Sequence, residues 1–212
     1  MNRKVFILII ISSIIYSNVS LNAQKSEVKK LSVNTADSKV NWIGKKPTGE
    51  HHGYVKLTGG ELQLNKNELV GGSFTIDLNS IVNLDLSNEG MNERLVGHLK
   101  SADFFDVAKY PTANFVITKV TRVSGPAAGD AKATHRIEGD LTMKGITRKI
   151  SFDASVNLLN SKMVASSPAF TINRTWWGVN YQSKSIFAEL KDQFIYDDMT
   201  LAQAVKKAGV IL

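Results

Sequence analysis

The chain has 212 residues, no cysteine and a formal net charge of +7. This length is enough for one substantial hydrophobic core and gives no sign of a second domain. The absence of cysteine excludes disulfide bonds, and the basic residues are scattered rather than clustered into the patch that a nucleic-acid partner requires. We therefore expect one domain that is stabilised by packing and has no nucleic-acid partner.

Residues 1–23 have the pattern of a secretory signal peptide. Arg3 and Lys4 precede an apolar run that begins at Val5, and Leu21-Asn22-Ala23 resembles a cleavage site. The run is too short for a comfortable membrane span. We expect a periplasmic or secreted protein with a polar linker over residues 24–30 and one domain over residues 31–212. Its moderate basic charge would favour weak peripheral contact with anionic membranes.

Short alternating segments dominate the first part of this domain. Leu31 and Val33 alternate with polar residues, as do Val40 and Trp42, and each pair predicts a strand. Residues 55–64 predict a hairpin with a tight turn at Gly59-Gly60. The longer alternation over residues 69–78 predicts a strand with one apolar face.

The stretch from Asn88 to Phe115 (NEGMNERLVGHLKSADFFDVAKYPTANF) is different. Met91, Leu95 and Leu99 recur every four residues, which predicts a short helix that is capped by Asn88 and packs through this face. The adjacent Phe104 and Phe105 follow, and then Tyr110-Pro111 restricts the backbone before a new strand.

The remainder again predicts strands. Residues 114–123 are rich in β-branched side chains, and 124–132 form a loop. Residues 135–143 and 149–158 alternate on either side of a turn at Lys144-Gly145, and Phe170 and Ile172 lead into Arg174. Residues 185–194 predict a short helix, whereas residues 199–205 fit either a helix or a strand. About eight antiparallel strands with one or two short helices indicate an all-β sandwich or closed barrel.

No catalytic motif emerges from the ionisable residues. The four histidines lack the spacing of a metal site, no Gly-x-Ser-x-Gly elbow is present, and the carboxylates show no pairing. We therefore expect no enzyme activity, no metal and no cofactor. His51-His52 lies beside a turn and fits a solvated loop pair, and the alternative is that His52 faces inward as a polar anchor. His98 fits either a ligand contact or a hydrogen bond at the helix end.

Three segments resemble the YceI-like family of exported lipid-binding proteins. They are Asn88–Phe115, Glu138–Thr147 (EGDLTMKGIT) and Asn173–Gly178 (NRTWWG). The resemblance implies a lipocalin-like antiparallel barrel around an elongated cavity, and it favours a strand over residues 199–205. It also implies a polyisoprenoid or isoprenoid quinone as the bound ligand. The chain departs from the family pattern at Val96-Gly97, where an Asp often precedes the His-Leu pair.

The candidate lipid-binding residues combine the apolar strand faces with aromatic residues beside strand ends. They are Trp42, His52, Phe74, His98, Phe104, Phe105, Phe115, Phe170, Arg174, Trp176 and Trp177. Arg174 fits a head-group contact and a structural ion pair equally well.

The leading hypothesis is non-catalytic binding, sequestration or transport of one elongated apolar lipid by a monomer or homodimer. The alternative is a packed structural or stress-response module that binds a protein partner through an exposed aromatic rim.

Overall fold

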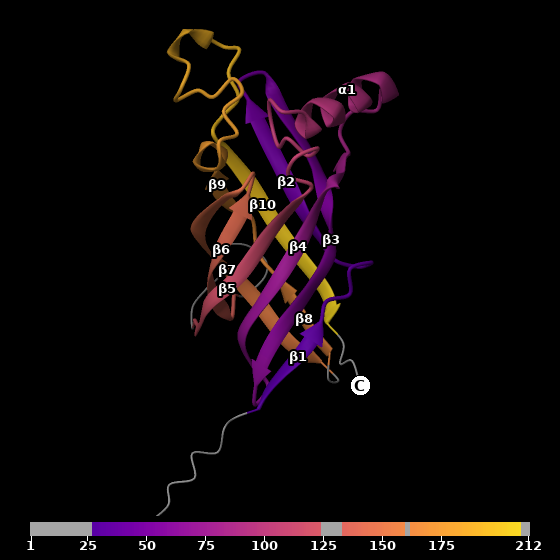
Figure 1. Cartoon of the computed structure of the whole chain (residues 1–212), viewed down its shortest axis with the longest axis vertical. Helices are drawn as coiled ribbons and strands as arrows, with labels where there is room; N and C mark the ends of the chain where they lie inside the picture. The colour runs from indigo at the N-terminus through magenta and orange to yellow at the C-terminus, as the bar shows by residue number, and fades with distance from the viewer. Residues whose placement is uncertain (1–26, 124–132, 160–161, 209–212) are drawn as a thin grey trace, which may run out of the picture.

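The computed structural model describes residues 27–123, 133–159 and 162–208, and it consists mainly of antiparallel strands (Figure 1). The strands are β1 (Val28–Ser32), β2 (Lys39–Lys46), β3 (Gly49–Asn65), β4 (Glu68–Asn83), β5 (Thr112–Arg122), β6 (His135–Met143), β7 (Ile146–Leu159), β8 (Lys162–Ser166), β9 (Phe170–Asn173) and β10 (Asp198–Ala208). The helices are α1 (Glu89–Lys100) and the 3-10 turns η1 (Arg174–Trp177) and η2 (Ala188–Leu190). The predicted all-β class is confirmed.

The long strand β3 closes the sheet into a barrel. From β3 the neighbours run through β2, β10, β8, β7, β6, β5 and β4, and β4 pairs with β3 again. This is feasible because β4 occupies one edge of β3, while β2 and β1 share the other edge end to end. The arrangement agrees with the lipocalin-like barrel that the resemblance implied, and closure leaves few unpaired strand edges.

Alternation decides which side chains face the interior. In β6 every second residue from His135 to Met143 is buried, and in β7 Phe152 and Ala154 are buried between more exposed neighbours. The turn between these strands, at Lys144 and Gly145, has φ angles of 49° and 73°. The predicted hairpin is confirmed, and its inward residues join a single hydrophobic core.

The predicted hairpin turn at Gly59-Gly60 is wrong. β3 runs through both glycines, and the pairing with β4 shifts register between Leu57 and Gly59. Gly60 has φ of +159° and lies so close to β4 that an added Cβ would meet the Ser73 carbonyl oxygen at 2.7 Å. The glycines therefore accommodate an irregularity and a close backbone approach within one strand.

The prediction for α1 is confirmed in its position and cap but wrong about its packing. The Asn88 side chain accepts a hydrogen bond from the Met91 backbone N–H. No residue of α1 is buried, however, and Met91 is 58% exposed. Of the expected apolar face, Leu99 packs against the core, and Asn92 of α1 donates hydrogen bonds to the Asn83 and Leu86 carbonyls.

The predicted helix over residues 185–194 is also wrong, because only the three-residue turn η2 lies there. The segment instead contains separate backbone hydrogen bonds, such as those from the Phe187 N–H to the Ser183 carbonyl and from the Ile195 N–H to the Gln182 carbonyl. Ile186 and Phe187 remain exposed. The four-residue spacing therefore does not produce a buried helix face here.

The described part of the chain begins and ends with a strand. The final segment is the strand β10, as the resemblance favoured, whereas β1 begins at Val28, inside the expected linker. The expected signal peptide and the predicted loop over 124–132 lie outside the described residues.

Candidate functional site

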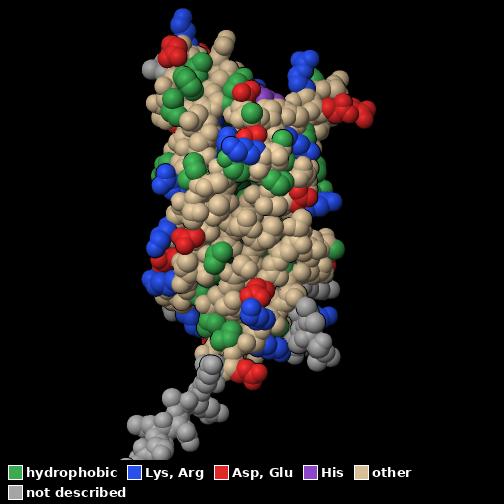
Figure 2. Space-filling model, viewed as in Figure 1, with side chains coloured by type: hydrophobic (Ala, Val, Ile, Leu, Met, Phe, Trp, Pro, Cys, Tyr) green, Lys and Arg blue, Asp and Glu red, His purple; other side chains and the backbone are tan. Residues whose placement is uncertain are grey.

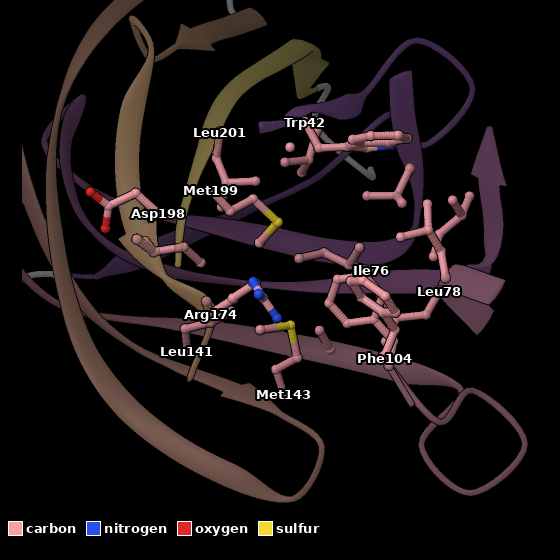
Figure 3. A pocket seen from close by; sticks show the side chains of 18 of the residues that line it. Trp42, Ile76, Leu78, Phe104, Leu141, Met143, Arg174, Asp198, Met199 and Leu201 are labelled. Carbon is pink, nitrogen blue, oxygen red and sulfur yellow. The ribbon is translucent and has the colours of Figure 1, made fainter. Parts of the chain in front are cut away.

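The barrel holds an apolar cavity at the end nearest α1, which we call the upper cavity. Its volume is about 120 Å³. The lining includes Val40, Trp42, Val55, Ile76, Leu78, Ile81, Leu99, Phe104, Phe105, Ala113, Leu141, Met143, Ile172, Met199 and Leu201. Figure 3 shows the labelled apolar side chains around this space, with the Asp198 carboxylate turned away from it. Such a wall favours an apolar guest.

A tight turn after α1 brings the predicted Phe104 and Phe105 to the cavity. The Ser101 carbonyl accepts hydrogen bonds from the backbone N–H groups of Phe104 and Asp106, and Asp106 has a positive φ of 48°. Lys144 donates from Nζ to the Phe104 carbonyl at 2.7 Å. Phe104 is consequently held in a buried position although it belongs to an irregular segment.

A second space, the rim groove, lies between α1 and the segment before β10. Its volume is about 420 Å³, and it is lined by Lys46, Thr48, His51, Leu95, His98, Phe104, Tyr181, Gln182, Asp192, Gln193, Phe194 and Ile195. Phe104 and Ile195 line the upper cavity as well, so the two spaces adjoin there. The mixed polar and apolar lining differs from the apolar wall inside the barrel.

The predicted residue His98 lies in this groove between two aromatic rings. Its ring meets Phe104 edge to face at 5.0 Å and Tyr181 at 4.5 Å, measured between ring centroids. His52 lies elsewhere. Its side chain is 48% exposed, and Gly53 and Val55, at the alternate positions of β3, are buried. The expectation that His52 faces inward is wrong, and its neighbour His51 lines the groove instead.

His51 belongs to a hydrogen-bond network of polar residues at the rim. Asp85 accepts hydrogen bonds from the His51 ring, the His52 backbone N–H and the Asn83 amide. Asn92 of α1 donates to the carbonyl oxygens of Asn83 and Leu86. Burial raises the pKa of Asp85, but these bonds outweigh burial and lower the pKa to about 2. Asp85 is therefore a carboxylate at neutral pH.

The guanidinium of Arg174 is buried and makes four hydrogen bonds to backbone carbonyls. It donates to Tyr196 at 3.2 Å, Val179 at 2.7 Å, Tyr181 at 2.9 Å and Ile195 at 3.2 Å. In Figure 3 the guanidinium lies between Met199 and Met143. Its donors hold the chain between β9 and β10 in place, which supports the structural interpretation of this residue.

Asp197 is the acidic partner of this arginine. Its Oδ1 lies 3.9 Å from Nη2 of Arg174 and accepts from the Ser183 hydroxyl, while Oδ2 accepts from the Ser185 backbone N–H. Burial lowers the pKa of Arg174, and the charge of Asp197 opposes that change. Arginine remains protonated in such surroundings, so the pair is a buried ion pair.

The two tryptophans of the Asn173–Gly178 motif have neighbouring rings, with centroids 6.3 Å apart, but differ in burial. Trp177 is fully buried and donates from Nε1 to the Leu141 carbonyl at 3.0 Å. Trp176 is 53% exposed, and neither residue lines the upper cavity. With Phe104 and Trp177 both buried, these residues do not form the exposed aromatic rim of the alternative hypothesis.

The predicted Phe74, Phe115 and Phe170, together with Phe152, form a row across the barrel interior, which we call the phenylalanine row. Its ring centroids are separated by 6.4 Å for Phe74–Phe115, 5.6 Å for Phe115–Phe152 and 4.5 Å for Phe152–Phe170. Phe74, Phe115 and Phe152 line a lower cavity of about 30 Å³. Of the predicted residues, Trp42, Phe104, Phe105 and Arg174 thus line the upper cavity and His98 lines the rim groove, whereas His52, Trp176 and Trp177 lie outside both spaces.

Sequence reasoning missed several residues of the site. Met199 and Leu201 alternate in β10, which was a usable signal, but that segment fitted a helix equally well. Tyr181 and Ile195 lie in an irregular segment where no periodic pattern predicts burial. Their positions depend on the hydrogen bonds of Arg174.

Two further features of the described residues bear on function. They contain no helix with the length and hydrophobicity needed to cross a membrane. Nor do three or more of their His, Asp and Glu side chains gather into a group that could hold a metal ion.

Curated relatives match short parts of the chain. A UPF0312 protein of Pseudomonas putida is 47% identical over 60 residues, which is 28% of this chain and 28% of that protein. A UPF0312 protein of Staphylococcus aureus is 31% identical over 96 residues, which is 42% of this chain and 49% of that protein. The matched stretch therefore spans less than half the length of either relative.

Solved structures resemble the whole barrel. BcnA of Burkholderia cenocepacia superposes with a TM-score of 0.63 at 20% identity, covering 82% of this chain and 98% of that one. A domain of Saccharophagus degradans, described as polyisoprenoid binding, superposes with a TM-score of 0.57 at 14% identity, covering 86% and 99%. At these identities the likeness concerns the fold. The model of the YceI-like domain matches residues 31–206, most of the chain, and the chain therefore belongs to the YceI-like family.

Proposed function

We propose that this protein binds one apolar lipid, a polyisoprenoid or isoprenoid quinone, and sequesters or carries it without chemical turnover. The observation that carries the proposal is the apolar upper cavity adjoining a partly polar groove at Phe104 and Ile195. A molecule with an apolar tail and a polar head matches this division. The polyisoprenoid-binding description of the Saccharophagus degradans neighbour supports the ligand class.

In this proposal the tail occupies the upper cavity and the head group stays in the rim groove. The energetics favour this arrangement. Burying a methylene group contributes about 0.8 kcal/mol, so a five-carbon isoprene unit contributes roughly 3–4 kcal/mol, whereas a hydrogen bond to the head group contributes about 1 kcal/mol net. The tail would therefore dominate affinity. His51, His98 and Lys46 in the groove would select the head group. We also propose that the protein acts in the periplasm or outside the cell, after loss of residues 1–23.

Native mass spectrometry tests the proposal on mature protein purified from its exported compartment. A co-purifying mass that denaturation releases, in the isoprenoid or quinone range, is the expected result. A protein of bare polypeptide mass that also takes up no added isoprenoid would overturn it.

A matched pair of variants locates the site. Ala113 lines the upper cavity and is 3% exposed, so Ala113→Met should fill the space and abolish uptake. Ala108 is exposed and lines none of the spaces described above, so Ala108→Met should bind like the parent. Equal uptake by both folded variants would place the ligand elsewhere.

A further inference from the structure

Two side chains lie between the rim groove and the upper cavity. Phe104 and Ile195 line both spaces, and no other residue of the described chain does so. The Phe104 side chain is buried, so its ring fills part of the place where the two spaces meet. Figure 3 shows it among the side chains that surround the cavity. A molecule that moves from the groove into the cavity therefore has to displace this ring or pass beside it.

Phe104 belongs to a group of three rings, which we call the ring cluster and which consists of His98, Phe104 and Tyr181. The ring centroids are 5.0 Å apart for His98–Phe104, 4.5 Å for His98–Tyr181 and 5.4 Å for Phe104–Tyr181. The guanidinium of Arg174 lies 5.8 Å from the centroid of the Phe104 ring. Contacts of these kinds attract beyond the burial of apolar surface. The Phe104 ring is therefore held by several partners at once.

The ring cluster joins the two walls of the rim groove. His98 belongs to α1, and Tyr181 belongs to the segment between β9 and β10. Phe104 lies in the turn after α1, where the Phe105 backbone N–H donates to the Leu99 carbonyl at the end of the helix. Displacement of the Phe104 ring therefore breaks its contacts to both walls.

The helix α1 can supply the movement that releases the ring. None of its residues is buried. Elements with few buried contacts open locally at a lower cost than the core strands of a protein. Nε2 of His98 also lies 3.5 Å from Oδ2 of Asp103, the residue before Phe104. The end of the helix and the turn are thus connected, and opening of this helix end would separate Phe104 from Tyr181.

We propose that Phe104 is a gate between the rim groove and the upper cavity, and that His98 and Tyr181 are positioning residues that hold the gate closed. This inference rests on the proposed function and adds to it the residues that set the rate of lipid entry and exit. In the closed state the Phe104 ring shields the cavity from the groove. The gate opens when the ring leaves its partners, so the rate of exchange depends on the contacts within the ring cluster.

Stopped-flow mixing of the mature protein with a fluorescent farnesyl analogue in free solution tests the gate. Phe104→Ala removes the ring and should raise the association rate constant by about tenfold, which corresponds to a barrier lower by about 1.4 kcal/mol. Phe105→Ala is the matched comparison, since Phe105 lines the upper cavity but not the rim groove. It should weaken binding through faster dissociation, with an unchanged association rate constant. An unchanged association rate constant in folded Phe104→Ala, or an equal rise in both variants, would overturn the proposal.

Variants of His98 test the gate with Phe104 in place, and they apply even if Phe104→Ala does not fold. His98→Ala removes one partner of the ring and should raise the association rate constant by about threefold. His98→Phe restores a ring at this position and should return the rate constant to that of the parent. A general loosening of α1 would not give this rescue.

Val96→Ala is the control for the His98 variants. Val96 belongs to the same helix and lines none of the spaces described above, so its replacement should leave the association rate constant unchanged. An unchanged rate constant in His98→Ala, no rescue by His98→Phe, or an equal rise in Val96→Ala would contradict the gate.

The outcomes separate this inference from the proposed function. If the parent binds the analogue and the variants of the ring cluster associate at the parent rate, the gate is wrong and lipid binding stands. Failure of the parent to bind the analogue contradicts both proposals.

Discussion

Arg174 shows how one buried charge can organise an irregular segment. Its four carbonyl acceptors lie at Val179, Tyr181, Ile195 and Tyr196, on both sides of the excursion between β9 and β10. That excursion supplies Tyr181 and Ile195 to the rim groove. The residue therefore acts on the site by positioning its walls.

Replacing this guanidinium should destabilise the protein strongly. A lysine has three donors on one nitrogen and does not reproduce the planar fork, so Arg174→Lys should lower the free energy of unfolding by about 3 kcal/mol. Urea denaturation measures the change. Arg148→Lys is the control, since Arg148 is exposed and donates a single bond to the Trp176 carbonyl. Similar losses in the free energy of unfolding for the two variants would show that the buried hydrogen bonds of Arg174 stabilise the protein no more than the exposed one of Arg148.

Asp85 makes the rim sensitive to acid. Its pKa in the folded protein is about 2, against an ordinary value of 3.8. Because the folded pKa is lowered, the stabilisation is complete above about pH 4 and disappears as pH falls toward 2. Asp85→Asn should therefore lower the free energy of unfolding by about 1–2 kcal/mol at pH 6, allowing for partial solvent exposure. Denaturation at pH 2.5 should show a smaller deficit, and a deficit independent of pH would contradict this account.

At the scale of elements, α1 is attached to the barrel by polar contacts as well as by Leu99. Asn92 donates to the Asn83 and Leu86 carbonyls and to Oδ1 of Asn83. With no buried residue of its own, the helix should open locally more readily than the strands.

Removal of the Asn92 amide should loosen α1 alone. Asn92→Ala should speed amide exchange of the helix by about tenfold, corresponding to about 1.4 kcal/mol, and leave the barrel strands unchanged. Hydrogen exchange with mass spectrometry reads out both regions. Glu93→Ala, at an exposed position of the same helix, is the control and should have little effect. Uniform acceleration across the strands would instead indicate global destabilisation.

Periodicity predicted the elements well where one face is buried and the other exposed. β6, β7 and β10 were found on this basis or with help from the family resemblance. It failed at Gly59-Gly60, because two glycines signal a turn and a strand irregularity equally. It failed again over residues 185–194, where the backbone makes separate turn hydrogen bonds, such as Leu190 N–H to Phe187 and Gln193 N–H to Leu190, instead of a continuous helix.

The site was predictable only in part for a related reason. Aromatic residues at strand positions identify interior side chains such as Trp42 and Phe115. They do not reveal whether the interior is hollow, since that depends on ring orientation and on the space left by residues such as Gly139. The outward direction of His52 followed from the strand register, which the sequence did not reveal.

For the whole molecule, the parts follow one axis from the rim groove through the upper cavity to the phenylalanine row. The visible face carries acidic and basic side chains intermixed (Figure 2). At the α1 end, large apolar side chains are exposed among the charged ones, at Leu84, Met91, Ile186 and Phe187. The rim groove therefore lies at an end of the barrel that carries exposed apolar side chains, which suits exchange of an insoluble ligand with a membrane surface.

Replacing exposed apolar side chains at the α1 end should slow transfer of the ligand from a membrane without changing the affinity of the protein for the ligand. Met91→Glu combined with Phe187→Glu should reduce the rate of uptake of a fluorescent farnesyl analogue from phosphatidylcholine vesicles containing phosphatidylglycerol by about tenfold. The same analogue in free solution should bind with unchanged affinity, because neither side chain lines the upper cavity. Val70→Glu combined with Val116→Glu places an equal new charge on two exposed apolar residues of the barrel flank and should leave transfer unchanged. If this flank variant slowed transfer as much, the effect would reflect repulsion of the whole protein from the anionic vesicle, and the α1 end would not be the membrane-facing surface.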